Sequence, residues 1–496
     1  MIAKRFRNGG VRSITAWGVC ALVGALGAIK PVSAEPALLY ARMQPVAVDS
    51  GRLDNPRNEP AVVFSQVIDL GPDAPWVRVL FDKETTLAPG SYIRVTSLVD
   101  AETQILDAEQ LRNWNYGTAF FNGSQVTIEL IAAGGASGNA LKVSQVFVGE
   151  IPPSVDTGGV AAICGNDDNR APFQFPYDSQ SMGIGRLLNT VVQPEGENTV
   201  PLKGCTAFIV GRPSGTENPD KLHLTAGHCF DHLDLGREWN QNLTDPYVLQ
   251  FNVYCYAGTE STCSNTNCTI KHPAVVHQFP VRGETVISQN DGAGNDWAVF
   301  RCGRNSVGKT TWEHQTTPTP PYTRWAFPLA DPVPGVGTDV RVTGYGVDGN
   351  EGALGGGNAA CICNTSTTGR RNVTLQTAPG PAPPQPPSVE AKLRGVSGTV
   401  IAYDADMCGA NSGSPVFNRD TGEVIGINTH HGCASTTPET GLNYGTAITH
   451  TDLQPAIVFL ENTAIPAAST WGLIVMTLIG LVLGTIMYGR RRVARA

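Results

Sequence analysis

The chain has 496 residues, more than the roughly 100 to 200 residues of one typical domain, so we expect two or three folded units with tails. Its formal net charge is -8, and its lysines and arginines form no strong basic stripe that could meet phosphates, which argues against a nucleic-acid partner.

The first 34 residues have the layout of a secretory signal peptide. Basic residues come first, an apolar run follows at residues 19–29, and Val-Ser-Ala at residues 32–34 forms a small-residue cleavage site before Glu35. The apolar run is short and two glycines interrupt it, so we favour a cleaved leader over an uncleaved anchor. The rest of the chain would then be exported.

Cysteine usage agrees with export, because disulfides form and persist outside the cytoplasm. The sequence has 12 cysteines, and Cys20 would leave with the leader, so 11 remain. An odd number leaves at least one cysteine unpaired or joined to another molecule.

Residues 35–150 alternate polar and apolar side chains with period two, for example at 76–81 and 126–130. Asn122-Gly123 is a hairpin signal between two such runs. We therefore expect a β-sandwich domain, which could be a propeptide chaperone, a carbohydrate- or surface-binding module, or a structural spacer. Residues 151–161 are rich in proline and glycine and are predicted to be a linker.

The pattern of residues 162–462 also predicts many short strands joined by glycine and proline turns, with almost no long amphipathic helix. This segment is long enough to form two small barrels. The proline-rich runs at 317–321 and 379–387 are predicted surface loops. A cysteine-dense stretch at 255–268 is a predicted disulfide-stapled loop.

Three residues in this region suggest nucleophilic catalysis. His228 ends a Leu-Thr-Ala-Gly-His run, Asp296 precedes the run Trp-Ala-Val-Phe, and Ser412 lies in a glycine-rich turn. The order His, Asp, Ser is that of the chymotrypsin double barrel and differs from the orders of subtilisins and α/β-hydrolases. Ser412 would be the nucleophile, His228 its general base, and Asp296 the group that orients the imidazole.

The runs at 224–229, 295–300, 411–416 and 426–434 resemble those of bacterial trypsin-like serine peptidases near the glutamyl endopeptidases, and the resemblance spans about residues 162–455. It implies an all-β, chymotrypsin-like double barrel and a serine endopeptidase that acts on protein or peptide substrates through an acyl-enzyme, with no cofactor. It also implies two disulfides, Cys205–Cys229 and Cys408–Cys433.

Two positions depart from the animal members of that family. Asn411 stands where those enzymes have the aspartate that pairs with a new N-terminus, so activation by N-terminal insertion is not expected. Ala410 stands where the first oxyanion donor is usually glycine. We still expect the backbone N–H groups of Ala410 and Ser412 to form the oxyanion hole.

The predicted substrate pocket contains charges of opposite preference. Asp406 lies six residues before Ser412, the offset at which trypsins place the carboxylate that selects Arg or Lys. Thr429 and His430 resemble the pocket of glutamyl endopeptidases, in which a histidine receives an acidic side chain. The sequence leaves both preferences open, with basic residues slightly favoured.

The same residues admit two alternative interpretations. A zinc site could use His430, His431, Cys433, Cys361 and Cys363, but Cys361 and Cys363 have one intervening residue and no second Cys-x-x-Cys accompanies them, so no metal is predicted. The chain could also be an inactive, surface-displayed binding protein on a protease scaffold. The intact set of His228, Asp296 and Ser412 argues against that reading.

Residues 463–496 form a tail that resembles the IPTL-type sorting tails of Gram-negative bacteria. Ile-Pro at 465–466, Ser469 and Trp-Gly at 471–472 match the motif, an apolar run follows at 472–488, and four arginines come last. The apolar run is a predicted transmembrane helix with its arginines in the cytoplasm and the catalytic region outside. The resemblance implies a sorting enzyme of the inner membrane as partner; an ordinary membrane anchor is the alternative.

Overall fold

The computed structural model describes the following residues: 32–33, 37–149, 164, 171–172, 183–190, 199–211, 221–230, 247–253, 272–314, 326–347, 373–378, 391–407, 411–433 and 441–463. Several predicted features lie outside them: most of the leader, the linker at 151–161, the proline-rich and cysteine-dense loops, Cys408, Ala410 and the tail beyond residue 463.

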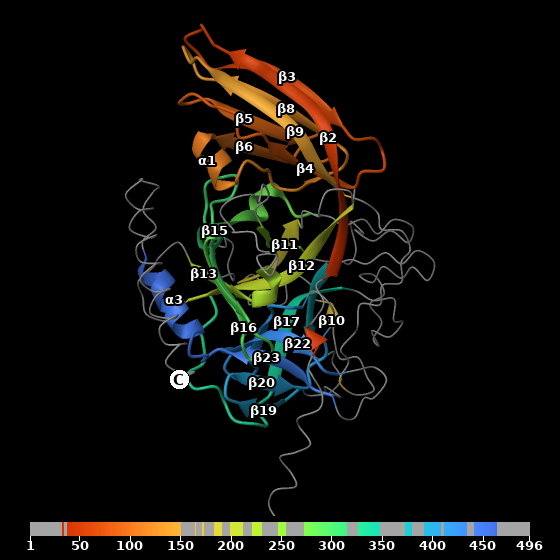
Figure 1. Ribbon diagram of the computed structural model, residues 1–496, viewed down its shortest axis with the longest axis vertical. Coiled ribbons are helices and arrows are strands. Elements are labelled where there is room, and N and C mark those ends of the chain that lie inside the picture. Colours follow the sequence, from red (N-terminus) through yellow and green to blue (C-terminus); the bar gives the residue numbers. More distant parts are fainter. Residues whose placement is uncertain are drawn as a thin grey trace, which may run out of the picture.

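Residues 37–149 form an N-terminal module with two sheets, the orange part at the top of Figure 1. The first sheet has the antiparallel order β3 (Ala61–Asp69), β8 (Gln125–Ala132), β5 (Tyr92–Ser97) and β6 (Thr103–Asp107). Buried residues alternate along β5 and β6, as the period-two pattern predicts.

The second sheet of the module contains β2 (Ala37–Leu53), β9 (Asn139–Gly149), β4 (Trp76–Phe81) and β7 (Phe121–Asn122). Every residue of β4 is buried, because both of its faces are covered. The strand β2 is 17 residues long and has two partners. Its second part pairs with β9, and its first part, residues 37–42, pairs with β12 (Thr199–Val210) of the next domain.

The first barrel follows directly in the same ten-stranded sheet. Its strands run in the order β11 (Ile184–Thr190), β14 (Val248–Gln250), β15 (Gln278–Asn290), β16 (Asp296–Cys302), β13 (Leu222–Thr225) and β12. An additional pairing of β11 with β12 closes this order into a ring. Closure removes sheet edges and leaves the interior to be filled by side chains.

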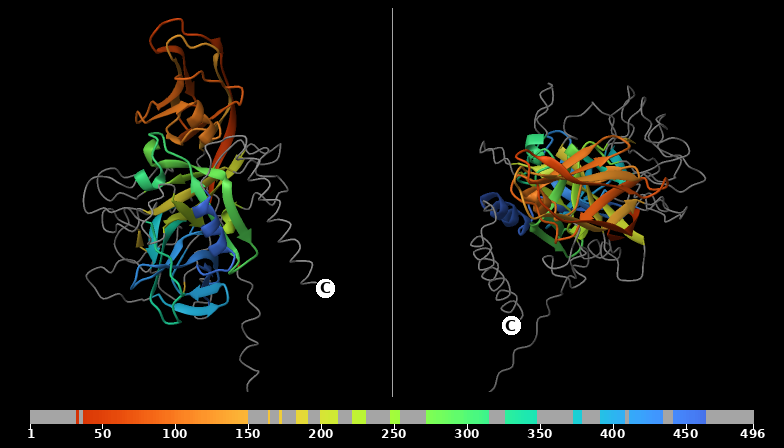
Figure 2. Two further views of the ribbon diagram at one scale, coloured as in Figure 1. Left: turned by 90° about the vertical axis from the view of Figure 1, so that its left-hand side faces the viewer. Right: turned by 90° about the horizontal axis from the view of Figure 1, so that it is seen from above.

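The second barrel lies at the opposite end from the module, as the side view in Figure 2 also shows. Its strands run in the order β17 (Val340–Val347), β21 (Pro415–Asn418), β22 (Val424–His431), β23 (Asn443–Ala447), β20 (Val400–Tyr403) and β19 (Leu393–Ser397). Backbone bonds from Val340 to Ala391 and from Leu393 to Thr338 join the two ends. Short strands β10 (Ala171–Pro172), β18 (Val373–Ala378) and β1 (Val32–Ser33) add to this sheet.

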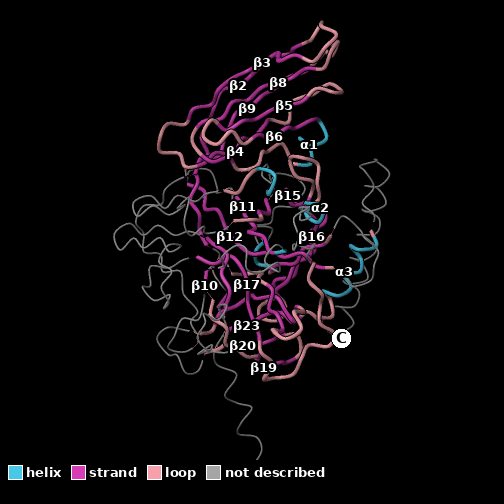
Figure 3. The backbone as a smooth tube through the Cα atoms, turned by 180° about the vertical axis from the view of Figure 1, so that it is seen from behind, coloured by secondary structure: helices cyan, strands magenta, loops and turns pink. Residues whose placement is uncertain are grey.

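The prediction of an all-β, chymotrypsin-like double barrel is therefore confirmed, and helices are few in the described part of the chain (Figure 3). They include α1 (Ala108–Asn113), α2 (Thr311–His314), α3 (Leu453–Asn462), the 3-10 helix η3 (Val275–His277) and a short 3-10 turn at residues 227–230. No helix among the described residues is long and apolar enough to cross a membrane. The predicted span at 472–488 lies outside those residues.

Buried polar contacts fasten the N-terminal module to the first barrel. The side chain of Gln278 accepts a hydrogen bond from the N–H of Phe120 at 3.0 Å and donates one to the C=O of Phe120 at 2.9 Å. The side chain of Asn122 makes the same double contact with the backbone of His272, at 3.0 and 2.9 Å. The rings of Phe120 and His272 stack at 4.5 Å, and Trp76 packs edge-on against both. Such an interface does not fit a loosely tethered spacer.

The interface yields a first prediction. Gln278→Ala leaves the N–H and C=O of Phe120 buried without their side-chain partner, and each unsatisfied group costs about 1–3 kcal/mol. We therefore expect Gln278→Ala to lower the free energy of unfolding by at least about 2 kcal/mol in urea denaturation. The matched control is Gln66→Ala, which removes only an exposed 3.4 Å contact with Ala47 and should change stability by less than about 0.5 kcal/mol. Equal effects of the two substitutions would contradict the described interface.

Candidate active site

The turn that carries His228 begins where β13 ends. All four residues of β13 are buried, which fixes the exit of the chain from the first barrel. Gly227 then passes so close to β15 that a Cβ at this position would lie 2.0 Å from the C=O oxygen of Gln289. Only glycine fits there. The close approach brings the next residue, His228, to the start of β16.

Asp296 is the first residue of β16, and its side chain is completely buried. Its Oδ1 accepts the backbone N–H of His228 at 2.9 Å, and its Oδ2 lies 2.6 Å from Nδ1 of the same residue. A carboxylate only accepts, so Nδ1 carries the proton, and in this neutral tautomer Nε2 is the basic atom of the ring. Two contacts to one carboxylate also fix the ring orientation.

The turn that carries Ser412 is held by both barrels. The C=O of Ser412 accepts the N–H of Thr206 at 2.8 Å and lies 3.9 Å from the sulfur of Cys229, the residue after His228. Gly413 donates to the C=O of Asn428 in the second barrel at 2.8 Å. The backbone of Gly413 has φ +86°, and a Cβ there would lie 2.1 Å from the C=O oxygen of Thr206, so glycine is required.

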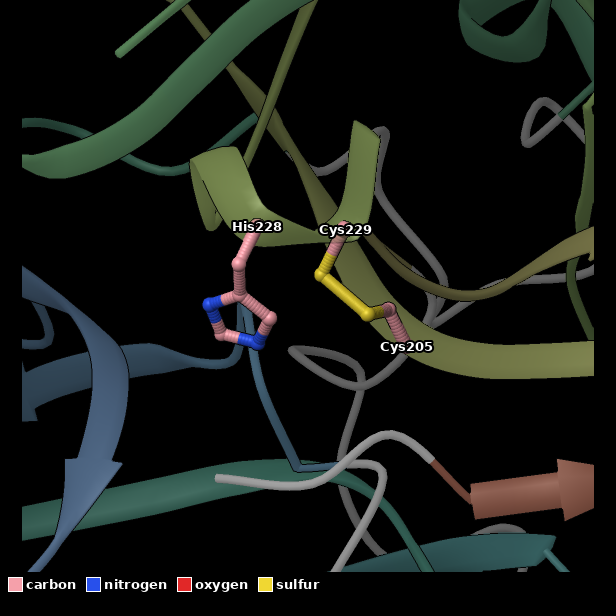
Figure 4. A group of neighbouring side chains, drawn as sticks. All are labelled: Cys205, His228 and Cys229. Atoms are coloured by element: carbon pink, nitrogen blue, oxygen red, sulfur yellow. A yellow bond between two sulfur atoms is a disulfide. The ribbon is translucent and has the colours of Figure 1, made fainter. Parts of the chain in front are cut away.

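The structure thus brings the Ser412 turn against the His228 turn, from segments almost two hundred residues apart in sequence. The disulfide Cys205–Cys229, implied by the resemblance, is present and ties the His228 turn to β12 (Figure 4). It closes a loop with a sequence separation of 24 residues, which limits the freedom of this turn in the unfolded chain.

The expected disulfide Cys408–Cys433 is wrong. Cys433 pairs instead with Cys164, whose Cα lies 4.9 Å away although the two residues are 269 positions apart. The carboxylate of Asp406 holds Cys164 in place by accepting its backbone N–H at 2.7 Å. Cys408 lies outside the described residues.

Two of the predicted pocket residues have partners that the sequence did not indicate. Asp406 is buried, and Cys164 engages its carboxylate, as described above. Nδ1 of His430 lies 2.9 Å from Oγ1 of Thr429 and 3.8 Å from Oδ2 of Asp296. The His430 ring centroid is 6.5 Å from that of His228. His430 therefore packs beside the His228–Asp296 pair.

Burial lowers the pKa of His430 to about 4, an effect that the neighbouring Asp296 partly opposes and that His228 reinforces. His430 is therefore neutral at pH 7. Because the His430 ring is uncharged, it does not compete with His228 for an ion pair with the Asp296 carboxylate. The described residues also weaken the metal alternative, because Cys433 is in a disulfide, as are the two cysteines that lie near His228.

The sequence alone did not indicate two supporting residues of the second barrel. Asn428 supports the Ser412 turn, and Thr446 supports Asp296. Asn428, in the middle of β22, donates through Nδ2 to the C=O of Asn411 at 2.8 Å and accepts the hydroxyl of Tyr403 at 2.6 Å. Thr446 donates to the C=O of Asp296 at 2.7 Å from the second barrel. A polar Asn within the apolar run Val-Ile-Gly-Ile-Asn was the available signal, since a buried amide requires partners.

Comparison with known proteins gives the class of the domain. Residues 205–427 match the family model of the trypsin-like peptidase domain, and this segment includes His228, Asp296 and Ser412. The match supports a chymotrypsin-fold serine peptidase of the trypsin type. No curated protein matches the sequence.

Among solved structures, a Glu endopeptidase in complex with MPD is 14% identical with a TM-score of 0.34, and the match covers 61% of this chain and 100% of that one. A thermostable serine protease from an extremophilic microorganism is 15% identical with a TM-score of 0.33, over 58% of this chain and 100% of that one. An inactivated protease paralogue of the scabies mite is 11% identical with a TM-score of 0.33, over 60% and 97%.

The contact between His430 and Asp296 yields a second prediction. The carboxylate of Asp296 raises the pKa of His430 from the lower value that burial alone would give. We therefore expect the ring resonances of His430 to titrate with a midpoint near pH 4, and Asp296→Asn to move that midpoint lower, as measured by NMR. His277 is the control, because burial alone lowers its pKa to about 4 and its midpoint should not move. A His430 midpoint that is unchanged in Asp296→Asn would rule out the described contact.

Proposed function

We propose that the chain is a serine endopeptidase that uses Ser412, His228 and Asp296 to hydrolyse peptide bonds. The observation that carries the proposal is the double hydrogen bond of His228 to the buried Asp296, with the Ser412 turn bonded to Thr206 and lying against Cys229. The match of residues 205–427 to the trypsin-like peptidase domain supports it.

In this mechanism Nε2 of His228 takes the proton from Oγ of Ser412 as that oxygen attacks the scissile carbonyl carbon. The imidazolium that forms is stabilised by Asp296 at 2.6 Å. His228 then gives the proton to the leaving amine, and an acyl-enzyme on Ser412 remains. Water, activated by the same histidine, releases the acid and restores the enzyme.

The developing oxyanion requires backbone donors, and we assign them to the N–H groups of Ala410 and Ser412. Ala410 lies outside the described residues, so its role follows from the sequence motif. Preorganised donors of this kind contribute about 3–4 kcal/mol each to the stabilisation of the transition state.

Cleavage specificity depends on the charged groups near the proposed substrate pocket. Cys164 already engages the carboxylate of Asp406, and His430 lies beside Asp296, so each of the two charges invoked for the pocket has another partner. We retain a slight preference for basic residues as a prediction from the sequence, together with Thr429 as a pocket residue. A peptide-library profile dominated by cleavage after Glu would overturn that preference.

The third prediction tests the nucleophile. Ser412→Ala should lower kcat/KM for a peptide substrate by about a thousandfold or more, because the attacking oxygen is lost, and should leave the urea unfolding curve unchanged. Ser414→Ala, two residues further in the same turn, is the matched control and should stay within about tenfold of the wild type. Its hydroxyl makes only a long contact of 3.5 Å with Oδ1 of Asn411, and the substitution keeps its backbone bonds with Asn411 and Asn428. Activity of Ser412→Ala near the wild-type level would refute the assignment.

We also propose that the protein is exported and processed at both ends. The leader at 1–34 and the tail at 463–496 support this by their sequence patterns, with a sorting enzyme of the inner membrane as the partner of the tail. The mature protein would be secreted or held at the surface of a Gram-negative cell.

The fourth prediction follows from this processing. Mass spectrometry of the mature protein should find an N-terminus at Glu35 and a C-terminus between residues 465 and 472, because the proline at 466 predicts from the sequence an irregular stretch that a protease could reach. Recovery of an intact Ala496 in the membrane fraction would leave only a permanent anchor.

A further inference from the structure

The C-terminal end of β22 pairs with β1, a strand from the N-terminal part of the sequence. β21 pairs with β22 only as far as Ile427, and β22 continues to His431. Val32 and Ser33 of β1 pair antiparallel with His431 and His430 along this extension, where Figure 1 shows β1 as a red arrow beside β22. An uncovered strand edge offers N–H and C=O groups to any extended peptide, and here the occupant is the chain itself.

The same N-terminal stretch is attached to the first barrel four residues later. Ala37, the first residue of β2, pairs with Gly204 on β12. Four residue steps span at most about 14 Å, so Ser33 on the second barrel and Ala37 on the first barrel are close in space.

Both attachment points are close to His228. The His430 ring, at the β1 pairing, is 6.5 Å from the His228 ring. Gly204, at the β2 pairing, precedes Cys205, which is bonded to Cys229 next to His228 (Figure 4). The N-terminal stretch therefore joins the two barrels at the place where the candidate active site forms.

We propose that Val32 and Ser33 occupy the edge of β22 at which an extended peptide substrate would pair, so that the chain that retains its leader is held inactive by its own N-terminal strand. This inference rests on the proposed function. Cleavage after Ala34, the predicted leader site, would detach β1 while β2 keeps all of its pairings with β12 and β9.

The strand β1 has only two residues, but it can compete with substrate because it is attached to the fixed strand β2. A segment tethered by three residues to a fixed strand has an effective concentration in the millimolar range or above. After cleavage the same segment could bind only from solution. The occlusion is therefore strong before cleavage and weak after it.

The test compares the full chain with a chain that begins at Glu35. We expect kcat/KM for a peptide substrate to be about tenfold or more higher in the chain that begins at Glu35. A peptide with the sequence of residues 28–34, added to that chain, should inhibit it competitively, raising KM without changing kcat. The same peptide with both Val32→Pro and Ser33→Pro should not inhibit, because it has no backbone N–H at either of the two residues that pair with β22.

A second readout does not depend on catalysis. In the Ser412→Ala background, the fluorescently labelled 28–34 peptide should bind the chain that begins at Glu35 and bind the full chain at least about tenfold more weakly. Loss of hydrolysis in all chains with this binding difference intact would refute only the proposed function. Equal hydrolysis by the two chains, or equal binding of the peptide and its proline variant, would overturn the inference.

Discussion

The buried carboxylate of Asp296 is the interaction on which the rest of the site depends. A buried charge is costly unless it is paired and hydrogen-bonded, and Asp296 meets this condition with the backbone and the ring of His228. Its own backbone also bonds to Thr446 of the second barrel, and His430 of that barrel packs beside its side chain. One residue at the start of β16 thus links His228, the proposed general base, to both barrels.

The serine turn is placed by a different set of constraints. Thr206 of the first barrel bonds to the C=O of Ser412, and Asn428 of the second barrel bonds to the backbone of both of its neighbours. Gly413 supplies the conformation that allows the close approach. The Cys205–Cys229 disulfide fixes the opposing turn. The site therefore exists only when the two barrels are in register, because no single segment contains more than one of its reacting groups.

Local patterns in the sequence predicted what depends on local structure. Alternating side chains predicted the strands of the N-terminal module, and the order of the three motifs predicted the double barrel. Contacts between distant segments were beyond this reasoning. Nothing local shows that Cys164 meets Cys433, that β2 is shared by two domains, or that His430 packs against Asp296. Each of these contacts depends on the register of the barrel strands, and composition does not determine that register.

The shared strand β2 also changes how the N-terminal module is understood. A module that continues the sheet of the first barrel and bonds to it through Gln278 and Asn122 is packed as one unit with that barrel. Its first residue, Ala37, pairs with Gly204, which precedes Cys205 of the disulfide that holds the His228 turn.

The central claim is that one reactive serine is activated by the His228–Asp296 pair. Labelling of the chain that begins at Glu35 with a fluorophosphonate probe, followed by peptide mapping, tests it most directly. The account predicts one label per chain, on Ser412, and its loss in His228→Ala. A label on another residue, or none on the correctly folded protein, would contradict it.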